Sequence, residues 1–197
     1  MTDEYKTITD KLSEGFYSEK RSKFLAFAVH VTTEQQVKDI VQQYRKKYYD
    51  ARHICYAYVL GADRELFRAN DDGEPSSTAG KPILGQITKN ELTDILIIVV
   101  RYYGGVNLGT SGLIVAYRTA AAEAIENAEI VSKYCEEEVD FSFPYIMMND
   151  VMKVIKEMSP NIISQKYDNL CEIKLSIRRS LAPILREKLD KLAFKDD

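Results

Sequence analysis

The sequence predicts an α+β protein with two domains, a larger one over residues 1–130 and a smaller one over residues 131–197. The chain has 197 residues, of which 45% are hydrophobic, so it is long enough for two domains with cores of their own. Eight of the nine glycines lie between Gly61 and Gly112, which assigns most special loops to the first domain. After residue 130 the hydrophobic pattern changes to short strands and helices in the order β-α-β-β-α.

The first half of the larger domain is predicted as strand, helix, strand. Residues 16–31 carry aromatic and β-branched residues around a polar centre and are typical of one strand. Thr33 then begins a helix, because Gln36 three residues later completes a capping box. Residues 53–60 form the next strand, with alternating side chains on its two faces.

The second half of this domain is predicted to alternate loops with regular elements. Residues 67–80 are too rich in turn formers for any regular element, and a short helix begins near residues 81–82. The uncharged run 95–100 indicates a strand buried on both faces. A glycine-rich loop follows, and a helix extends over residues 112–127.

The smaller domain follows the ferredoxin-like, or split βαβ, order of elements. A strand at residues 139–143 precedes a helix that ends before Pro160. Strands at 162–167 and 171–177 form a hairpin, and a last helix carries leucines at helical spacing. A final edge strand is expected after this helix.

Composition restricts the class of protein. The balance of 27 basic and 30 acidic side chains gives a net charge of −3, so the whole chain does not require a nucleic-acid partner, although a local basic face stays open. We expect no membrane segment and no secretion signal, hence a cytoplasmic protein with three reduced cysteines. Two histidines exclude a multi-histidine metal site, and we expect neither a metal nor a cofactor.

The strand at 95–100 ends in Arg101, and the loop and helix start that follow could bind an anion. Free amides at a helix start, with the positive end of its dipole, favour anions. Thr110 and Ser111 could add hydroxyl donors, and Arg101 could pair with a phosphate. The spacing is not that of a nucleotide-binding P-loop. The alternative is a tight turn in which Thr110 and Ser111 only cap the helix.

An acidic loop is the second candidate. It carries Asp71, Asp72 and Glu74, with Lys81 shortly after. Three carboxylates could hold Mg²⁺ or act as general acids and bases. The same residues are also ordinary turn formers, and their spacing does not match a calcium-binding loop.

Three further side chains have both a structural and a chemical interpretation. His53 could be an acid or base, or a structural histidine on a strand. Cys55 is two residues away on the same face, but this spacing does not ensure a Cys-His dyad. Tyr102 and Tyr103 could stack on bases or belong to the core.

We expect these groups to face one groove, because the loop and helix start lie at the strand end where α/β sheets commonly bind ligands. Arg101→Ala is expected to remove binding and leave folding largely intact. The predicted binding residues are His53, Asp71, Asp72, Glu74, Lys81, Arg101, Tyr102, Gly104, Gly105, Gly109, Thr110 and Ser111.

Two long motifs, DDGEPSSTAGKPIL and VVRYYGGVNLGTSGLIVAYRTAA, resemble the IMPACT family in its bacterial YigZ-like branch. KRSKFLAFAV and HICYAYVL fit the same family in order and spacing, so the resemblance covers residues 15–128. Ser77 and Ser111 stand where the family is expected to have glycine.

The resemblance implies a first domain like domain 2 of ribosomal protein S5 and a second similar to the C-terminal domain of elongation factor G. It also implies a link to translation, because the eukaryotic relatives regulate translation initiation by interfering with activation of a starvation-sensing kinase. The hypothesis is a cytoplasmic, translation-associated regulator that binds RNA, the ribosome or a protein partner through the groove. The alternative is an enzyme, or a binder of a phosphorylated small molecule, that uses residues 104–112. A non-enzymatic role is favoured, and neither catalytic residues nor an oligomeric state can be assigned.

Overall fold

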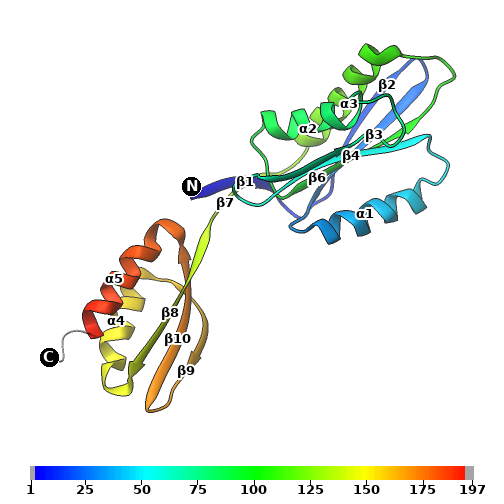
Figure 1. Ribbon diagram of the computed structural model, residues 1–197. Helices are drawn as coiled ribbons and strands as arrows, with labels where there is room; N and C mark the ends of the chain where they lie inside the picture. Colours follow the sequence, from blue (N-terminus) through cyan, green and yellow to red (C-terminus); the bar gives the residue numbers. More distant parts are fainter. Residues whose placement is uncertain (1–2, 194–197) are drawn as a thin grey trace. The chain divides into compact units, whose positions relative to one another are not determined.

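The structure is a computed structural model that describes residues 3–193, arranged as two compact units (Figure 1). The N-terminal unit is Tyr5–Lys133, and the C-terminal unit comprises the described residues of Met1–Glu4 and Tyr134–Asp197. The final edge strand expected from the sequence would fall at residues 194–197, outside the described residues.

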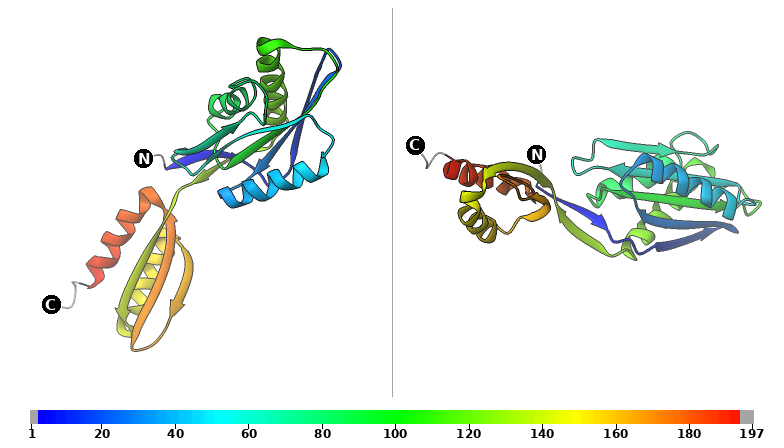
Figure 2. Two further views of the ribbon diagram at one scale, coloured as in Figure 1. Left: turned by 45° about the vertical axis from the view of Figure 1, so that its right-hand side comes forward. Right: turned by 90° about the horizontal axis from the view of Figure 1, so that it is seen from below.

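The N-terminal unit is built on a five-stranded, wholly antiparallel sheet with the order β2-β3-β6-β4-β5. Helix α1 covers one face, and helices α2 and α3 cover the other, as the views in Figures 1 and 2 agree. The strands are β2 (Ser13–Glu19), β3 (Ser22–His30), β4 (His53–Leu60), β5 (Leu66–Asn70) and β6 (Ile95–Tyr102). The helices are α1 (Glu34–Lys47), α2 (Gly80–Lys89) and α3 (Gly109–Glu126). A separate two-stranded sheet joins β1 (Glu4–Ile8) to β7 (Ile130–Tyr134).

The two faces of the large sheet have different cores. Under α2 and α3 the core contains many alanines, and a Cβ at Gly15 would overlap the α3 backbone, so this helix lies close against β2. Under α1 it contains larger residues, including Phe27 and Tyr58. The central strand β6 has every residue from Ile95 to Val100 fully buried, which confirms the prediction of a strand covered on both faces.

The predicted strand at residues 16–31 is wrong, because this segment is a hairpin of β2 and β3. The chain reverses at Lys20 and Arg21, which have φ of +47° and +65°. Two consecutive positive φ values suit a two-residue hairpin turn, where asparagine and glycine are preferred. Lysine and arginine carry no such signal, so the period-two pattern continues across the turn without a visible break.

Two boundaries also differ from the sequence-based expectation. Residues 67–80 were expected to be irregular, but they include most of β5, which pairs with β4 at the edge of the sheet. Helix α3 begins at Gly109 and not at Gly112. At β5, pairing with β4 overrides a local sequence that is rich in turn formers.

The C-terminal unit confirms the predicted β-α-β-β-α order. Its antiparallel sheet has the order β8-β10-β9, and two helices with short 3₁₀ turns before them complete the unit. The strands are β8 (Glu136–Pro144), β9 (Asn161–Lys166) and β10 (Leu170–Arg178), and the helices are α4 (Met148–Met158) and α5 (Ala182–Ala193). Its hydrophobic core includes Phe143, Leu175 and Leu189.

No helix within residues 3–193 is a candidate for a membrane-spanning segment. None of the helices there combines the length and the apolar character that a bilayer-spanning segment requires.

Candidate functional site

The candidate site lies at the end of the large sheet where β6 ends and β4 begins. His53, the first residue of β4, is the register partner of Arg101 on β6, and Phe24 of β3 is the partner on the other side. The expectation that these residues meet rested on a rule for parallel sheets. The sheet is antiparallel, and the residues meet because the start of one strand is paired with the end of its neighbour.

Arg101 is a buried cation. Its side chain is 6% exposed, and Nη1 donates a hydrogen bond of 2.5 Å to Oε1 of Glu74, whose side chain is 3% exposed. The guanidinium carbon lies 5.6 Å from the ring centroids of both Phe24 and Tyr103. Nε is buried and has no hydrogen-bond partner among the described residues. Glu74 therefore holds this cation in place.

Glu74 is the centre of a buried polar network. Its Oε1 also accepts a 2.7 Å hydrogen bond from the Tyr117 hydroxyl on α3, and its Oε2 lies 3.8 Å from Nε2 of His53. The Sγ atom of Cys55 lies 3.3 Å from the same Tyr117 hydroxyl. Four elements of the fold, β4, β6, α3 and the acidic loop, thus meet at one carboxylate.

Asp71 closes the acidic loop onto the start of α2. Its carboxylate accepts hydrogen bonds from the backbone amides of Ser77, Ala79 and Gly80, at 2.9, 3.1 and 2.8 Å. Amides at a helix start need such acceptors. The side chain therefore has a structural function as a helix cap.

Asp72 ties the loop to β4 and α1. Its carboxylate accepts hydrogen bonds of 2.7 Å from the backbone amide of Ile54 and from Nη2 of Arg45. Its carbonyl oxygen lies 2.7 Å from Nδ1 of His53. Because a carbonyl only accepts, this contact assigns a proton to Nδ1 and leaves Nε2 as the acceptor of the neutral ring.

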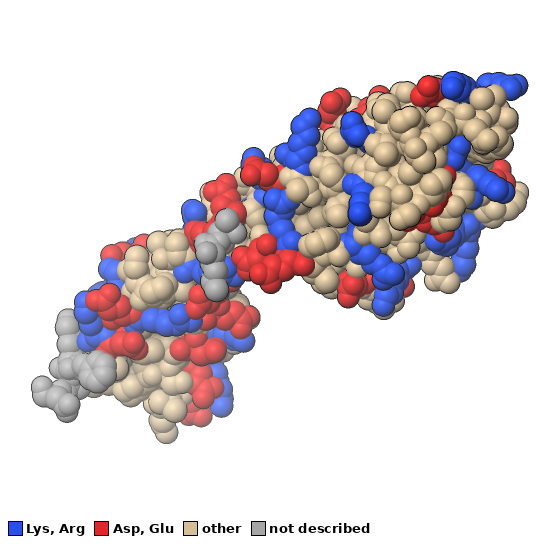
Figure 3. Space-filling view, turned by 45° about the horizontal axis from the view of Figure 1, so that its top comes forward, with Lys and Arg blue, Asp and Glu red and all other residues tan. Residues whose placement is uncertain are grey.

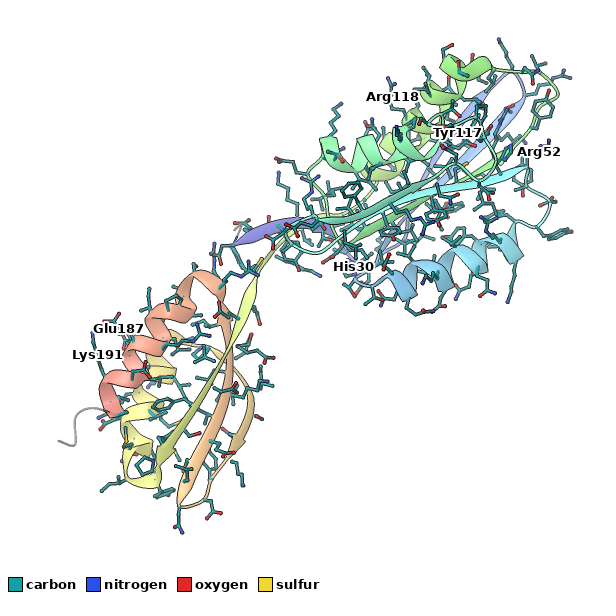
Figure 4. The ribbon with its side chains drawn as sticks, viewed as in Figure 1. His30, Arg52, Tyr117, Arg118, Glu187 and Lys191 are labelled. Atoms are coloured by element: carbon teal, nitrogen blue, oxygen red, sulfur yellow. The ribbon has the colours of Figure 1, made fainter. Side chains whose placement is uncertain are left out.

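A groove of about 530 Å³ lies over this network. Figure 4 shows Arg52 and Tyr117 at this end of the N-terminal unit and His30 at its opposite end. The groove is lined by Arg52, His53, Gly73, Glu74, Pro75, Arg101, Tyr103, Asn107, Leu108, Gly109, Thr110 and Leu113. Its charged side chains are two arginines and one buried glutamate, with a histidine beside them.

The structure brings five of the predicted binding residues to the groove. They are His53, Glu74, Arg101, Gly109 and Thr110. The other seven are not in its lining: Asp71, Asp72, Lys81, Tyr102, Gly104, Gly105 and Ser111. The common groove expected from the sequence therefore holds only in part, and the binding role of its residues stays a prediction.

Strand and helix geometry explain the residues that are absent from the lining. Side chains alternate across a strand, so Tyr102 packs on the α1 face, where its hydroxyl donates a 2.9 Å hydrogen bond to Asp50. Lys81 is an exposed residue of α2. Gly104 packs against the β2–β3 turn, and its amide donates a 3.1 Å hydrogen bond to the hydroxyl of Ser22.

The first turn of α3 forms one wall of the groove. Its N-cap is Leu108, so no side-chain hydrogen bond caps the helix start, and its first turn contains no acidic residue. The interpretation that Thr110 and Ser111 cap this helix is therefore wrong, because both lie inside the first turn. Among the described residues, no side chain caps the backbone amides in the first turn of α3.

The two serines in place of expected glycines are both accommodated. Ser77 adopts φ of +66°, so the backbone keeps the left-handed conformation although the residue has a Cβ. Ser111 is an exposed residue of the first turn of α3 and has no positive φ. Glycine is therefore not required by the backbone at position 111.

Three residues of the site or its network, Arg52, Asn107 and Tyr117, are not among those predicted from the sequence. Arg52 is next to His53, and its backbone amide donates a 2.9 Å hydrogen bond to the carbonyl of Arg101. Because Arg52 directly precedes β4, beside the candidate residue His53, its position in the sequence could have indicated that it belongs to the site. Tyr117 belongs to the buried, apolar face of α3, and nothing in the neighbouring sequence indicates that its hydroxyl reaches Glu74.

The burial of the Glu74–Arg101 pair changes one expectation. From the sequence, Arg101→Ala was expected to remove binding and leave folding largely intact. With both side chains almost fully buried, this substitution would leave a buried carboxylate without its cation, which is strongly destabilising. A binding experiment therefore needs other variants.

Cys55 should resist thiol reagents in the folded protein. Burial raises the pKa of its thiol, the hydrogen bond with Tyr117 lowers it, and the charges of Glu74 and the neighbouring aspartates raise it further. The net effect is an elevated pKa, whereas a nucleophilic cysteine needs a lowered one. Labelling with a disulfide reagent, followed by mass spectrometry, should modify Cys55 only when urea unfolds the protein. Rapid modification of native Cys55 would contradict this and revive the Cys-His dyad.

Comparison with known proteins adds the family. The model of the Impact N-terminal domain matches residues 20–125. IMPACT family member YvyE of Bacillus subtilis is 34% identical over 157 residues, covering 80% of this chain and 72% of that protein. IMPACT family member YigZ of Escherichia coli is 32% identical over 187 residues, covering 90% and 92%.

A solved structure has the same fold over the whole chain. A crystal structure described as that of a hypothetical protein superposes with a TM-score of 0.76 at 27% identity, covering 100% of this chain and 96% of the other. The family match extends over more than half of the chain and includes both long motifs that form the acidic loop and the start of α3. The resemblance seen in the sequence is thereby confirmed, and this chain belongs to the IMPACT family.

Proposed function

We propose that this chain is a cytoplasmic, translation-associated regulator whose N-terminal unit binds single-stranded RNA across the groove. The observation that carries the proposal is the position of Arg52 and the uncapped start of α3 on the walls of one groove, with buried Arg101 in its lining. Phosphate groups are the anions that such donors favour. The connection to translation rests on family membership and on the role that the resemblance implies.

Exposed cations lie in the groove and next to it at the same end of the sheet, where Figure 3 shows Lys and Arg along the right-hand border of the N-terminal unit. We call the following residues the basic rim: Lys20, Arg21, Lys23, Lys46 and Arg52. The first two form the β2–β3 turn beside Gly104, and Lys23 is the register partner of Tyr102. A net charge of −3 therefore does not prevent a local surface suited to phosphates.

Aromatic side chains accompany the cations. Tyr103 lines the groove and is 47% exposed, and Tyr49, which follows α1, is 85% exposed. Exposed aromatic rings between cations are typical of surfaces that stack single-stranded bases while tracking the backbone. RNA is therefore favoured over a folded protein partner.

RNA binding should depend strongly on salt. For about four phosphate contacts, the affinity for a labelled single-stranded RNA should fall roughly 50-fold between about 50 and 200 mM salt, because bound counterions are released. Fluorescence anisotropy measures this directly. Charge reversal in a Lys20→Glu/Arg21→Glu variant should weaken binding and flatten the salt dependence.

Lys89→Glu is the matched control. Lys89 is the exposed last residue of α2, close to the start of β6 and so at the opposite end of the sheet. The Lys89→Glu variant makes the net charge more negative, as Lys20→Glu/Arg21→Glu does, although it reverses one charge and not two. It should leave the affinity for RNA nearly unchanged. The proposal would be contradicted if no RNA bound or if binding did not depend on salt. It would also be contradicted if Lys89→Glu lost as much RNA affinity per reversed charge as Lys20→Glu/Arg21→Glu.

A further inference from the structure

Strand β5 is an open edge of the large sheet. It is the last strand in the order β2-β3-β6-β4-β5 and pairs only with β4. Among residues 3–193, no second strand and no side chain bonds to the outer backbone edge of β5. Unpaired amides and carbonyls along a sheet edge are a template for another extended chain.

The opposite edge of the same sheet, β2, is covered. The amide of Phe16 donates a 2.5 Å hydrogen bond to the carboxylate of Glu123 on α3. At the end of this helix, the side chain of Asn127 donates a 2.9 Å hydrogen bond to the carbonyl of Glu14. Side chains that cover an edge in this way hinder its pairing with another chain. The contrast makes β5 the edge of this sheet that is available to a partner.

Apolar surface accompanies the open edge. Leu66 and Phe67 of β5 are 46% and 58% exposed. Phe67 also lines a pocket of about 320 Å³, which we call the edge pocket and which is formed by Val59, Arg64, Phe67, Leu84 and Thr88. Leu84 and Thr88 come from α2, so the edge pocket lies between this helix and the strands. A pocket beside a strand edge can take a side chain of a strand that is added there.

The helix beside the edge pocket is basic. Helix α2 contains two exposed cations, Lys81 and Lys89, and no acidic residue. Lys81 precedes Leu84 by three residues and Thr88 by seven, so it shares the face of the helix that lines the edge pocket. An anionic group beside β5 would therefore meet a lysine on this wall.

The strand beside the edge pocket is basic as well. Arg68 is the one charged residue of β5 and is exposed, and Arg64 is the one charged residue in the lining of the edge pocket. The exposed acids Asp63 and Glu65 precede β5 and lie outside that lining. Together with the two lysines of α2, the arginines make four cations against two acids. A segment with negative charges complements this edge.

We propose that β5 docks an acidic, extended segment of a protein partner, which pairs with β5 as an added strand and places an apolar side chain in the edge pocket. The backbone of β5 supplies affinity, and the pocket and its cations supply specificity. Nucleic acids lack the row of amide and carbonyl groups that pairs with a strand edge, so a protein segment is favoured over RNA at β5. The proposal goes beyond RNA binding, because it concerns another surface and another class of partner.

The probe is a short peptide with blocked ends, in which valine, phenylalanine and valine are flanked on each side by two glutamates. Titrated into the isotope-labelled full chain up to roughly millimolar concentration, it should shift the backbone amide resonances of β5 and α2. Those of β2 should stay in place. A peptide with lysine in place of every glutamate should bind at least about tenfold more weakly.

Methylation of the peptide backbone tests strand pairing directly. The amides of a strand point alternately to its two sides, so two versions of the glutamate peptide are made, each with methyl groups on one alternate set of amides. The version whose methyl groups face β5 should lose at least about tenfold in affinity, and the other should bind like the parent peptide. An equal loss in both versions, or in neither, would overturn strand pairing.

Variants of the protein test the pocket and the charges. Phe67→Ala should weaken the glutamate peptide at least about tenfold. Phe16→Ala is the matched control, because Phe16 is a 48% exposed phenylalanine on the covered edge strand β2, and it should leave the affinity unchanged. Arg68→Glu/Lys81→Glu should reverse the preference, so that the lysine peptide binds more tightly than the glutamate peptide. All four side chains are exposed, so the variants should fold, which circular dichroism checks.

Each other outcome overturns the docking of an acidic segment at β5. It is wrong if the glutamate peptide shifts no resonance of β5, or if Phe16→Ala loses as much affinity as Phe67→Ala. Displacement of the peptide by single-stranded RNA would assign this edge to nucleic acid instead. Dimerisation of the protein alone, measured by light scattering and abolished by Phe67→Ala, would assign it to a second copy of the chain.

Discussion

The Glu74→Ala variant should lose about 3–5 kcal/mol of unfolding free energy, because it leaves the Arg101 cation buried without its carboxylate. The pair is almost fully enclosed, and Tyr117 would lose its acceptor as well. Urea unfolding of the purified variant measures the change. In a Glu74→Leu/Arg101→Met double variant most of this loss should be recovered, since both charges are then absent from the interior.

An exposed ion pair provides the control. Lys174 and Glu138 of the C-terminal unit are 2.6 Å apart, with side chains 38% and 57% exposed. Glu138→Ala should cost only a small fraction of the loss expected for Glu74→Ala, because solvent screens the pair. If the double variant is as unstable as the sum of its single variants, then the buried pair is not the coupled unit described here.

The Gly104→Ala variant should be the most damaging small substitution near the groove, with a loss of about 3 kcal/mol. A Cβ at this position would overlap the carbonyl carbon of Arg21 and the amide nitrogen of Ser22, and backbone atoms cannot move aside cheaply. The loop that leads into α3 would separate from the β2–β3 turn. Thermal or urea unfolding, with the Ser22 amide resonance as a local probe, measures both effects.

Gly105→Ala is the neighbouring comparison. A Cβ there meets open space, but φ is +85°, so the expected cost is the left-handed backbone alone, about 1–2 kcal/mol. Comparing the loss of unfolding free energy in Gly104→Ala and Gly105→Ala separates the effect of close packing from that of backbone conformation. A larger loss at position 105 would show that the contact with the β2–β3 turn contributes little.

The elements that were predicted correctly are those whose signal is contained in a short stretch of sequence. The capping box at Thr33 and Gln36 is present in the structure, with both reciprocal hydrogen bonds. The apolar run at residues 95–100 is fully buried, as its composition requires. The C-terminal unit has the predicted order because its strands and helices change period clearly along the chain.

The errors occur where distant contacts override local signals. Lys20 and Arg21 form a hairpin turn that their residue types do not announce, and β5 exists because β4 offers it a partner. The acidic loop shows the same limit. Its three carboxylates looked alike in sequence, but Asp71 caps a helix, Asp72 holds β4 and α1, and Glu74 is buried beside Arg101.

The sequence by itself determined the fold class, the family and the two segments that meet at the groove, because each depends on local periodicity or on a contiguous motif. Only the tertiary structure decided which groups are free to act. Antiparallel register sets His53 beside Arg101, the packing of α3 brings Tyr117 to Glu74, and the early start of α3 places Gly109 and Thr110 in the groove lining as helical residues. Whether a carboxylate or a guanidinium is satisfied depends on atoms far away in sequence, and that pairing decides whether it can bind a ligand.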